Sequence, residues 1–225
     1  MCSKHGEYEA KITVVMGHEI KTACPQCVLP LVSVQSAKHP SWVTKRREHM
    51  TFDNYKAENE RQSIVLSRVC KYAENFKRVL ELGTCLTLIG PPGTGKTHLA
   101  TSMALSVNAS GFSVAYYSLY DLLTRLKATY GKASTETEQV IIKNLSQIDL
   151  LVLDEVGLKN LSETDLALTY QVIDKRYENI KPTVIISNLS LKDLETCLGE
   201  RTVDRFYENH GTVLVCDWSS HRRKK

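Results

Sequence analysis

One eight-residue motif constrains the fold of this chain more than any other feature. Residues 90–97 read Gly-Pro-Pro-Gly-Thr-Gly-Lys-Thr, which fits the pattern G-x-x-x-x-G-K-[ST] of a phosphate-binding P-loop. An apolar run at 86–89 precedes the motif, and a helical pattern follows it. Glycines in such a loop let successive backbone N–H groups face a phosphate, and the next helix adds its positive N-terminal dipole. The motif therefore predicts nucleotide binding.

The side chains of the motif have expected roles in holding ATP and a metal ion. Lys96 can reach the β- and γ-phosphates, and the Thr97 hydroxyl can ligate Mg²⁺. The residues predicted to bind the nucleotide are Gly90, Pro91, Pro92, Gly93, Thr94, Gly95, Lys96, Thr97, His98 and Asp154.

Two carboxylates at the end of an apolar run supply the second half of the expected site. The sequence Leu-Leu-Val-Leu at 150–153 reads as a central parallel strand buried on both faces, and Asp154 and Glu155 follow it. Open α/β sheets bind ligands at the carboxyl ends of their strands. We expect Asp154 to support the Mg²⁺ shell with Thr97, and Glu155 to polarise the attacking water as general base. The two motifs together predict an ATPase.

The composition is that of a globular protein with no membrane anchor. The chain has 225 residues, of which 42% are hydrophobic and 24% charged, enough for one domain and a small appendage. No apolar run approaches the length of a membrane span, and the polar N-terminus lacks a signal-peptide core. Seven cysteines, an odd number, favour a reducing compartment over a disulfide framework. We therefore expect a cytoplasmic protein.

Two short basic clusters give a weak indication of an anionic partner. They are Lys45-Arg46-Arg47 and residues 221–225, in a chain whose net charge is only +4. Clusters this short are usually solvated surface, and that is the more frequent explanation here.

Residues 1–50 differ from the rest and contain two pairs of potential metal ligands. A C-x-x-H pair and a C-x-x-C pair flank two short strands expected within 10–22. A hairpin would bring the pairs together as a zinc-ribbon-like site, which would stabilise a module too small to fold alone. The predicted zinc ligands are Cys2, His5, Cys24 and Cys27, with His18 as an alternative to His5. Ordinary reduced cysteines near a terminus are the competing explanation.

Predicted strands and helices alternate through residues 51–225, which we take as the second domain. The expected strands are 86–89, 113–118, 150–153, 183–187 and 212–216; the expected helices are 53–82, 98–108, 119–130, 135–148, 162–179 and 199–209. This alternation predicts an α/β fold with a parallel, doubly wound sheet.

Two further features narrow the class of ATPase. Asn188 follows the strand 183–187, where its amide could position the attacking water. Arg201 and Arg205 lie four residues apart on one helix, and an arginine aimed at a neighbouring subunit's γ-phosphate would make hydrolysis depend on assembly. This set resembles the AAA+ ATPases, and more narrowly the branch of DnaC-type replicative helicase loaders and IstB-type transposition helpers. The resemblance rests on residues 51–55, 90–100, 150–157, 198–206 and 217–222.

The resemblance implies further site residues. It assigns Asn188 as sensor 1, Arg205 as the arginine finger and Arg222 as sensor 2, with Arg201 as a partner of a neighbouring acid. It also implies that the helix 119–130 touches single-stranded DNA, where Lys127 could meet a phosphate and Tyr130 could stack on a base. Because the chain ends three residues after Arg222, the helical lid of an AAA+ domain would be minimal.

The function implied by the resemblance is ATP-dependent loading of the replicative DNA helicase onto single-stranded DNA. ATP would assemble protomers into a ring or open spiral, and residues 1–50 would bind the helicase. Two alternatives stay open: a transposition helper that assembles on duplex DNA, and a DNA-binding adaptor in which the P-loop domain is only a nucleotide-dependent switch.

Overall fold

The computed structural model describes residues 12–15, 18–21, 40–131, 136–157, 161–208 and 211–221. The chain divides into two compact units, Met1–Pro40 and Ser41–Lys225. In the first unit, β1 (Ile12–Val15) and β2 (His18–Lys21) form an antiparallel pair, which matches the two short strands predicted there.

The zinc site stays a prediction. Cys2, His5, Cys24 and Cys27 all lie outside the described residues. Within the described ranges, no group of three or more His, Cys, Asp or Glu side chains is arranged to hold a metal ion.

A five-stranded parallel sheet forms the centre of the second unit. Its strands are β3 (Leu86–Ile89), β4 (Val114–Ser118), β5 (Leu150–Val156), β6 (Thr183–Ser187) and β7 (Thr212–Val215). They lie in the order β4-β5-β6-β3-β7, and every pair is parallel. The strands that precede the P-loop, the carboxylate pair and Asn188 are therefore neighbours. Their carboxyl ends meet at one edge of the sheet.

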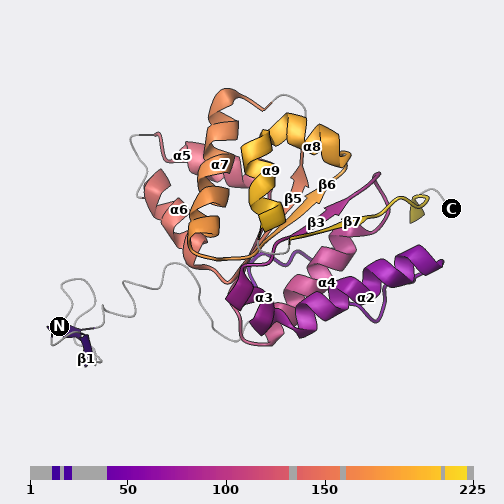
Figure 1. Cartoon of the computed structure of the whole chain (residues 1–225), viewed down its shortest axis with the longest axis horizontal. Helices are drawn as coiled ribbons and strands as arrows, with labels where there is room; N and C mark the ends of the chain where they lie inside the picture. Colours follow the sequence, from indigo (N-terminus) through magenta and orange to yellow (C-terminus); the bar gives the residue numbers. More distant parts are fainter. Residues whose placement is uncertain are drawn as a thin grey trace. The chain divides into compact units, whose positions relative to one another are not determined.

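Helices cover both faces of this sheet (Figure 1). One face packs against α2 (Glu60–Glu74), α3 (Phe76–Leu82) and α4 (Lys96–Ala109), and the other against α5 (Leu119–Ala128), α6 (Glu138–Gln147), α7 (Glu163–Glu178), α8 (Leu191–Leu198) and α9 (Glu200–Tyr207). Successive strand residues point to opposite faces, so Leu150 and Val152 enter the first core and Leu151 and Leu153 the second. The predicted doubly wound α/β fold is confirmed.

One predicted helix was wrong, and one helix was not predicted. The single helix expected over 53–82 is two helices, which are separated at Asn75. The first of them, α2, begins only after Asn59, whose side chain accepts a hydrogen bond from Gln62 N. Asparagine favours such end positions, which the apolar periodicity does not reveal. Helix α8 was not predicted; Ser190 caps it by accepting from Asp193 N at 3.2 Å. In the part of the chain that the structure describes, no helix is long and apolar enough to cross a membrane.

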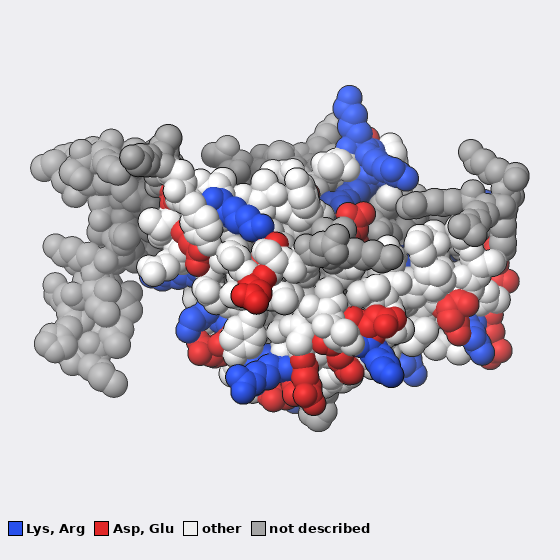
Figure 2. All heavy atoms as spheres, turned by 90° about the horizontal axis from the view of Figure 1, so that it is seen from above, with Lys and Arg blue, Asp and Glu red and all other residues white. Residues whose placement is uncertain are grey.

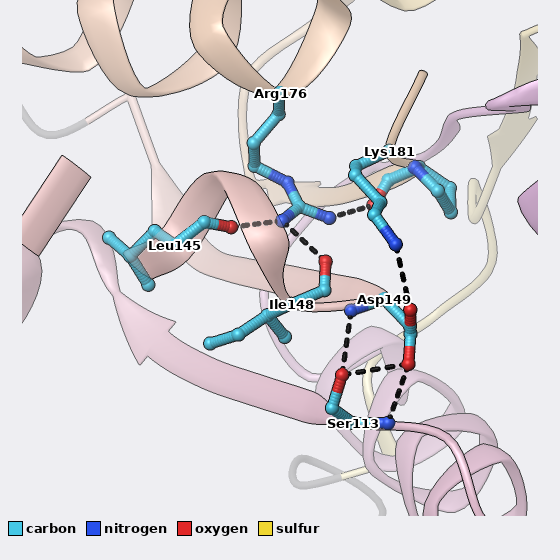
Figure 3. A network of polar contacts seen from close by, with 7 residues as sticks. Ser113, Leu145, Ile148, Asp149, Arg176 and Lys181 are labelled. Atoms are coloured by element: carbon cyan, nitrogen blue, oxygen red, sulfur yellow. Dashed lines mark hydrogen bonds and ion pairs between the residues drawn. The ribbon is translucent and has the colours of Figure 1, made fainter. Parts of the chain in front are cut away.

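A polar network ties the ends of three elements together on the α6–α7 side of the sheet (Figure 3). The fully buried Arg176 of α7 donates to Leu145 O, to Ile148 O at 2.8 Å and to Pro182 O at 2.6 Å. Burial lowers the pKa of Arg176 to about 10, so the guanidinium stays charged at neutral pH. Its hydrogen bonds pair carbonyl groups at the C-terminal end of α6 and just before β6. Without Arg176 these carbonyls would be buried and unpaired.

Asp149, in the same network, should make stability depend on pH. Burial alone would raise the pKa of its carboxyl, but hydrogen bonds from Lys181 (2.8 Å) and Ser113 outweigh burial and lower the pKa. A depressed pKa adds stability that is complete above the unfolded value of about 3.9 and is lost as pH falls through the folded value. Asp149→Asn should therefore lower the free energy of unfolding by about 1 kcal/mol at pH 7 and by progressively less below pH 4.

Urea unfolding of both proteins between pH 2.5 and pH 7 measures this difference. The exposed Glu178, paired with Lys175 on α7, provides the control; Glu178→Gln should change stability by less than about 0.5 kcal/mol. A loss for Asp149→Asn that is the same at every pH would contradict the assignment.

Candidate nucleotide-binding site

A cavity of about 700 Å³ opens at the carboxyl ends of β3, β5 and β6. Its volume falls within the range of small-molecule sites. Of the predicted nucleotide-binding residues, Pro92, Gly93, Gly95, Lys96, Thr97, His98 and Asp154 line it, together with Glu155 and Asn188. The structure therefore brings the P-loop, the carboxylate pair and the predicted sensor 1 to one cavity.

Lys96 lies at the start of α4 and is held against the P-loop backbone. Its Nζ donates to Gly90 O at 2.6 Å and to Pro91 O at 2.8 Å, and the residue is 4% exposed. The fully buried Thr94 donates its hydroxyl to Pro91 O at 3.0 Å. Gly90, Pro91 and Thr94 thus shape the loop from behind, while Lys96 and the α4 N-terminus present positive charge to the cavity.

Two P-loop glycines have no room for a side chain. Gly90 has φ of 141°, and a Cβ there would lie 2.2 Å from Cys216 O. Gly95 has φ of 91°, and its Cβ would lie 2.8 Å from a ring carbon of Tyr55. Tyr55 comes from the segment 51–55 that carries part of the family resemblance, so the P-loop is packed between this segment and Cys216, the residue that follows β7.

Asp154 is buried and both of its oxygens accept hydrogen bonds. The residue is 3% exposed; Oδ1 accepts from Glu155 N and Oδ2 from the Tyr116 hydroxyl, each at 2.8 Å. Burial, and then the negative charge of Asp154, raise the pKa of Tyr116 well above its usual value, so it stays a protonated donor. Arg47 lies 3.8 Å from the same Oδ2. The carboxylate is therefore fixed in orientation, as a metal ligand requires.

Sequence reasoning missed Tyr116 and Arg47 as site residues. Tyr116 lies inside an apolar strand, where an aromatic residue is ordinarily part of the core. Arg47 belongs to the basic cluster 45–47, which we interpreted as solvated surface. The residues next to Tyr116 in the sequence do not indicate which group its hydroxyl contacts. The basic cluster indicates a positive charge but not the carboxylate that Arg47 approaches.

Glu155 projects from an irregularity in the sheet. The pairing of β5 with β6 shifts register between Leu153 and Val156, and Glu155 has φ of 58°. Bulges next to active sites commonly redirect a side chain, and a left-handed non-glycine residue is strained. The Ser187 hydroxyl donates to Val156 O at 2.6 Å and so joins the end of β6 to that of β5. Glu155 and Asn188 consequently face one cavity from adjacent strands.

The last described residues pack against the P-loop. Cys216 N donates to Ile89 O at 2.7 Å, Trp218 Nε1 to Thr94 O at 2.9 Å, and His221 N to Gly93 O at 3.0 Å. His221 also lines the nucleotide cavity. Arg222, the predicted sensor 2, lies outside the described residues, and its role stays a prediction.

Arg205 lies away from this cavity and is held by α7. Its Nε is 3.4 Å from Asp174 Oδ1, and its Cζ lies 4.2 Å from the ring centroid of Tyr177. It lines a small second cavity with Thr183, the first residue of β6. Arg205 is therefore near the amino ends of the strands, about 15 Å, or one strand length, from the edge that carries the P-loop.

The two predicted DNA contacts both have partners within the chain. Lys127 Nζ lies 2.5 Å from Asp165 Oδ1, and this interaction is the main cause of the lowered pKa of Asp165. Tyr130 is 60% exposed, and its hydroxyl donates to Glu138 Oε2 at 2.7 Å. The Tyr130 ring remains accessible, whereas Lys127 would have to break its ion pair with Asp165 before it could bind a phosphate of DNA.

Charge is mixed on the face seen in Figure 2. Lys and Arg side chains there are interspersed with Asp and Glu over the described residues, in a chain of net charge +4. Binding of nucleic acid on this face would depend on individual side chains rather than on a broad basic surface.

Sequence comparison identifies relatives over most of the chain. The family model described as "IstB-like ATP binding protein" matches residues 35–225. The replicative helicase loader DnaC of Buchnera aphidicola (subspecies Acyrthosiphon pisum) is 34% identical over 173 residues, which cover 77% of this chain and 69% of the relative. The replicative helicase loader DnaC of Escherichia coli K12 is 30% identical over 195 residues, covering 86% and 77%.

Solved structures give the same result. The crystal structure of the DnaC helicase loader matches with a TM-score of 0.68 and 31% identity, covering 76% of this chain and 99% of that one. The replication initiator DnaA, bound to AMPPCP and single-stranded DNA, matches with a TM-score of 0.66, covering 79% and 52%. At 21% identity, the likeness to DnaA shows a shared fold only.

Proposed function

The chain belongs to the IstB-like ATP-binding protein family, and on this premise we propose that it loads a replicative DNA helicase onto single-stranded DNA. The observation that carries the proposal is a cavity that combines the P-loop, the β5 carboxylates and Asn188 in a chain similar over most of its length to DnaC loaders. ATP binding is the step on which the other steps depend.

Lys96, Thr97 and the α4 N-terminus would hold the phosphates of ATP. The donors fit a magnesium–nucleotide complex, because a hydroxyl and a buried carboxylate are oxygen ligands of the kind that Mg²⁺ prefers. Thr97 would ligate the ion and Asp154 would support its shell; when bound, the ion would neutralise charge on the transferred phosphate. Tyr116 keeps Asp154 oriented by its hydrogen bond.

Glu155 would act as the general base of hydrolysis, with Asn188 orienting the same water. Replacing Glu155 with Gln keeps the size of the side chain but removes its ability to accept a proton. We expect hydrolysis to fall about a hundredfold, with ATP affinity unchanged, and an ATP-bound assembly to accumulate. Phosphate release under multiple turnover and equilibrium binding of a fluorescent ATP analogue measure the two properties.

Glu163→Gln, in the exposed first turn of α7, is the matched control and should hydrolyse ATP at the parent rate. If Glu155→Gln also does so, Glu155 is not the base.

Single-stranded DNA would contact the α5 side of the molecule, with Tyr130 as the stacking residue. Its exposed ring fits this role, because base stacking on an aromatic side chain needs an accessible face. Tyr130→Ala should weaken binding to an oligothymidine about tenfold. Fluorescence anisotropy at fixed salt measures this, with Tyr120→Ala, a similarly exposed position on α5, as the control. Equal losses for both variants, or none for Tyr130→Ala, would remove Tyr130 from the interface.

The helicase would bind through residues 1–50, which carry the predicted zinc ligands. Native mass spectrometry of the full chain with ATP and the replicative helicase of the same cell tests this directly. We expect a discrete loader–helicase assembly, with the mass of one zinc ion on each loader protomer. A helicase that stays free would contradict the loading function, and a metal-free protomer would remove the zinc site whichever partner binds.

A transposition helper is the second candidate function. The description of the matching family model favours it, since that family is named for IstB. An assembly on duplex DNA that recruits a transposase and ignores the helicase would support this candidate over the loader.

A further inference from the structure

Residues 41–50, which follow the first unit directly, form part of the nucleotide cavity. Thr44, Arg46, Arg47 and Met50 are among its lining residues. The segment folds as a short turn, with Arg47 N donating to Thr44 O at 2.7 Å and Met50 N to Arg47 O at 2.9 Å. The Ser102 hydroxyl of α4 donates to Met50 O at 3.1 Å, which attaches the end of the turn to the helix that begins at Lys96.

Two side chains of this segment pack on Tyr116, the residue that orients Asp154. The Trp42 ring stacks on the Tyr116 ring, with centroids 5.6 Å apart and planes inclined by 17°. The Arg47 Cζ lies 4.1 Å from the centroid of the same ring. A guanidinium at this distance from an aromatic ring gains a cation–π attraction. We call this cluster, in which Trp42 and Arg47 both pack on the Tyr116 ring, the 42–47 clamp.

The 42–47 clamp places a positive charge beside the predicted metal-supporting carboxylate. An Arg47 terminal nitrogen lies 3.8 Å from Asp154 Oδ2, and the two side chains are 22% and 4% exposed. The same oxygen already accepts from Tyr116. A divalent cation drawn to Asp154, directly or through a bound water, would come close to the Arg47 guanidinium. Little solvent would lie between the two charges to screen them. Like charges so placed repel, so the two cations compete for one carboxylate.

We propose that Arg47 and a nucleotide-bound divalent cation are alternative partners of Asp154, so that Mg·ATP, and not ATP alone, releases the 42–47 clamp. The inference rests on the proposed nucleotide binding and extends it to regulation. The clamp segment begins directly after Pro40, the last residue of the first unit. Metal binding would therefore free the stretch of chain that adjoins that unit. Arg47 is then a positioning residue that sets how much Mg²⁺ the site needs.

The Mg²⁺ requirement for nucleotide binding tests the competition. At a fixed concentration of a fluorescent ATP analogue, the half-saturating Mg²⁺ concentration should fall about fivefold in Arg47→Gln. Lys45→Gln is the matched control: it loses the same charge from the same segment, but the exposed Lys45 is not among the residues that line the cavity and makes no ion pair with Asp154 among the described residues. Its Mg²⁺ requirement should equal that of the parent chain.

Trypsin digestion gives a readout that does not depend on affinity or turnover. Lys45 and Arg46 are cleavage sites within the clamp segment and remain in Arg47→Gln. In the parent chain, cleavage after them should be faster with Mg·ATP than with ATP and EDTA. In Arg47→Gln it should be fast under both conditions. Mass spectrometry of the fragments assigns each cut.

Three results would overturn the inference. An unchanged Mg²⁺ requirement in Arg47→Gln, with digestion of the parent chain indifferent to Mg²⁺, removes the competition and leaves the proposed function intact. A higher Mg²⁺ requirement would mean that Arg47 supports the bound nucleotide. A parent chain that binds no nucleotide with or without Mg²⁺ removes the proposed function together with the inference.

Discussion

Replacing Lys96 with alanine is expected to weaken ATP binding about a thousandfold. The buried ammonium now donates to Gly90 O and Pro91 O and lies where phosphate oxygens would be its alternative acceptors. Charge-assisted hydrogen bonds are worth about 1.5–3 kcal/mol each, and losing two of them lowers affinity by about three powers of ten. Isothermal titration calorimetry with Mg·ATP measures the change.

The control for this prediction must separate lost phosphate contacts from a damaged loop. Lys77→Ala removes an exposed lysine from α3 and should bind ATP like the parent chain. Thermal unfolding without nucleotide shows whether Lys96→Ala keeps its fold. A folded Lys96→Ala variant that retains affinity within about tenfold would contradict the role of Lys96.

Replacing Arg205 with alanine should lower hydrolysis about a thousandfold and leave ATP affinity unchanged. The residue lies near the amino ends of the strands, one strand length from its own nucleotide cavity, so it could act only on the nucleotide of a neighbouring protomer. Arginine fingers supplied in this way contribute factors of about a thousand or more. Arg201→Ala, on the same helix and exposed, is the control and should hydrolyse normally.

Mixing two inactive variants tests whether Arg205 acts between protomers. In an equimolar mixture of Arg205→Ala and Glu155→Gln, some interfaces pair an intact Glu155 site with an intact Arg205. Activity should therefore reappear on mixing. A mixture as inactive as its components, or an Arg205→Ala protein with the parent rate, would show that Arg205 is only a structural partner of Asp174 and Tyr177.

The nucleotide motifs could be predicted from sequence because each is local. The P-loop is contiguous, and Asp154 and Glu155 end a single apolar run. The parallel sheet followed from the same logic, since buried strands and covering helices alternate along the chain. Asn188 was found in the same way, as the polar residue that follows the strand 183–187, and the structure places it on the same cavity as the P-loop.

The contacts that complete the site could not be predicted, because their partners are distant in sequence. Tyr116 and Asp154 are 38 residues apart and meet only because β4 and β5 are neighbours. Arg47 reaches the same carboxylate from a segment whose basic pattern is equally typical of solvated surface. The bulge that redirects Glu155 is likewise a property of strand pairing, which residue types alone do not encode.

Helicase loading on a closed circle of single-stranded DNA tests the central claim most directly. A closed circle offers no end to thread, so a helicase that encircles DNA has to be placed on it by another protein. The readout is displacement of an annealed oligonucleotide by the replicative helicase of the same cell. We predict that this chain with ATP accelerates displacement and that Lys96→Ala does not. Equal displacement with the chain, without it and with Lys96→Ala would contradict the claim that it is a helicase loader.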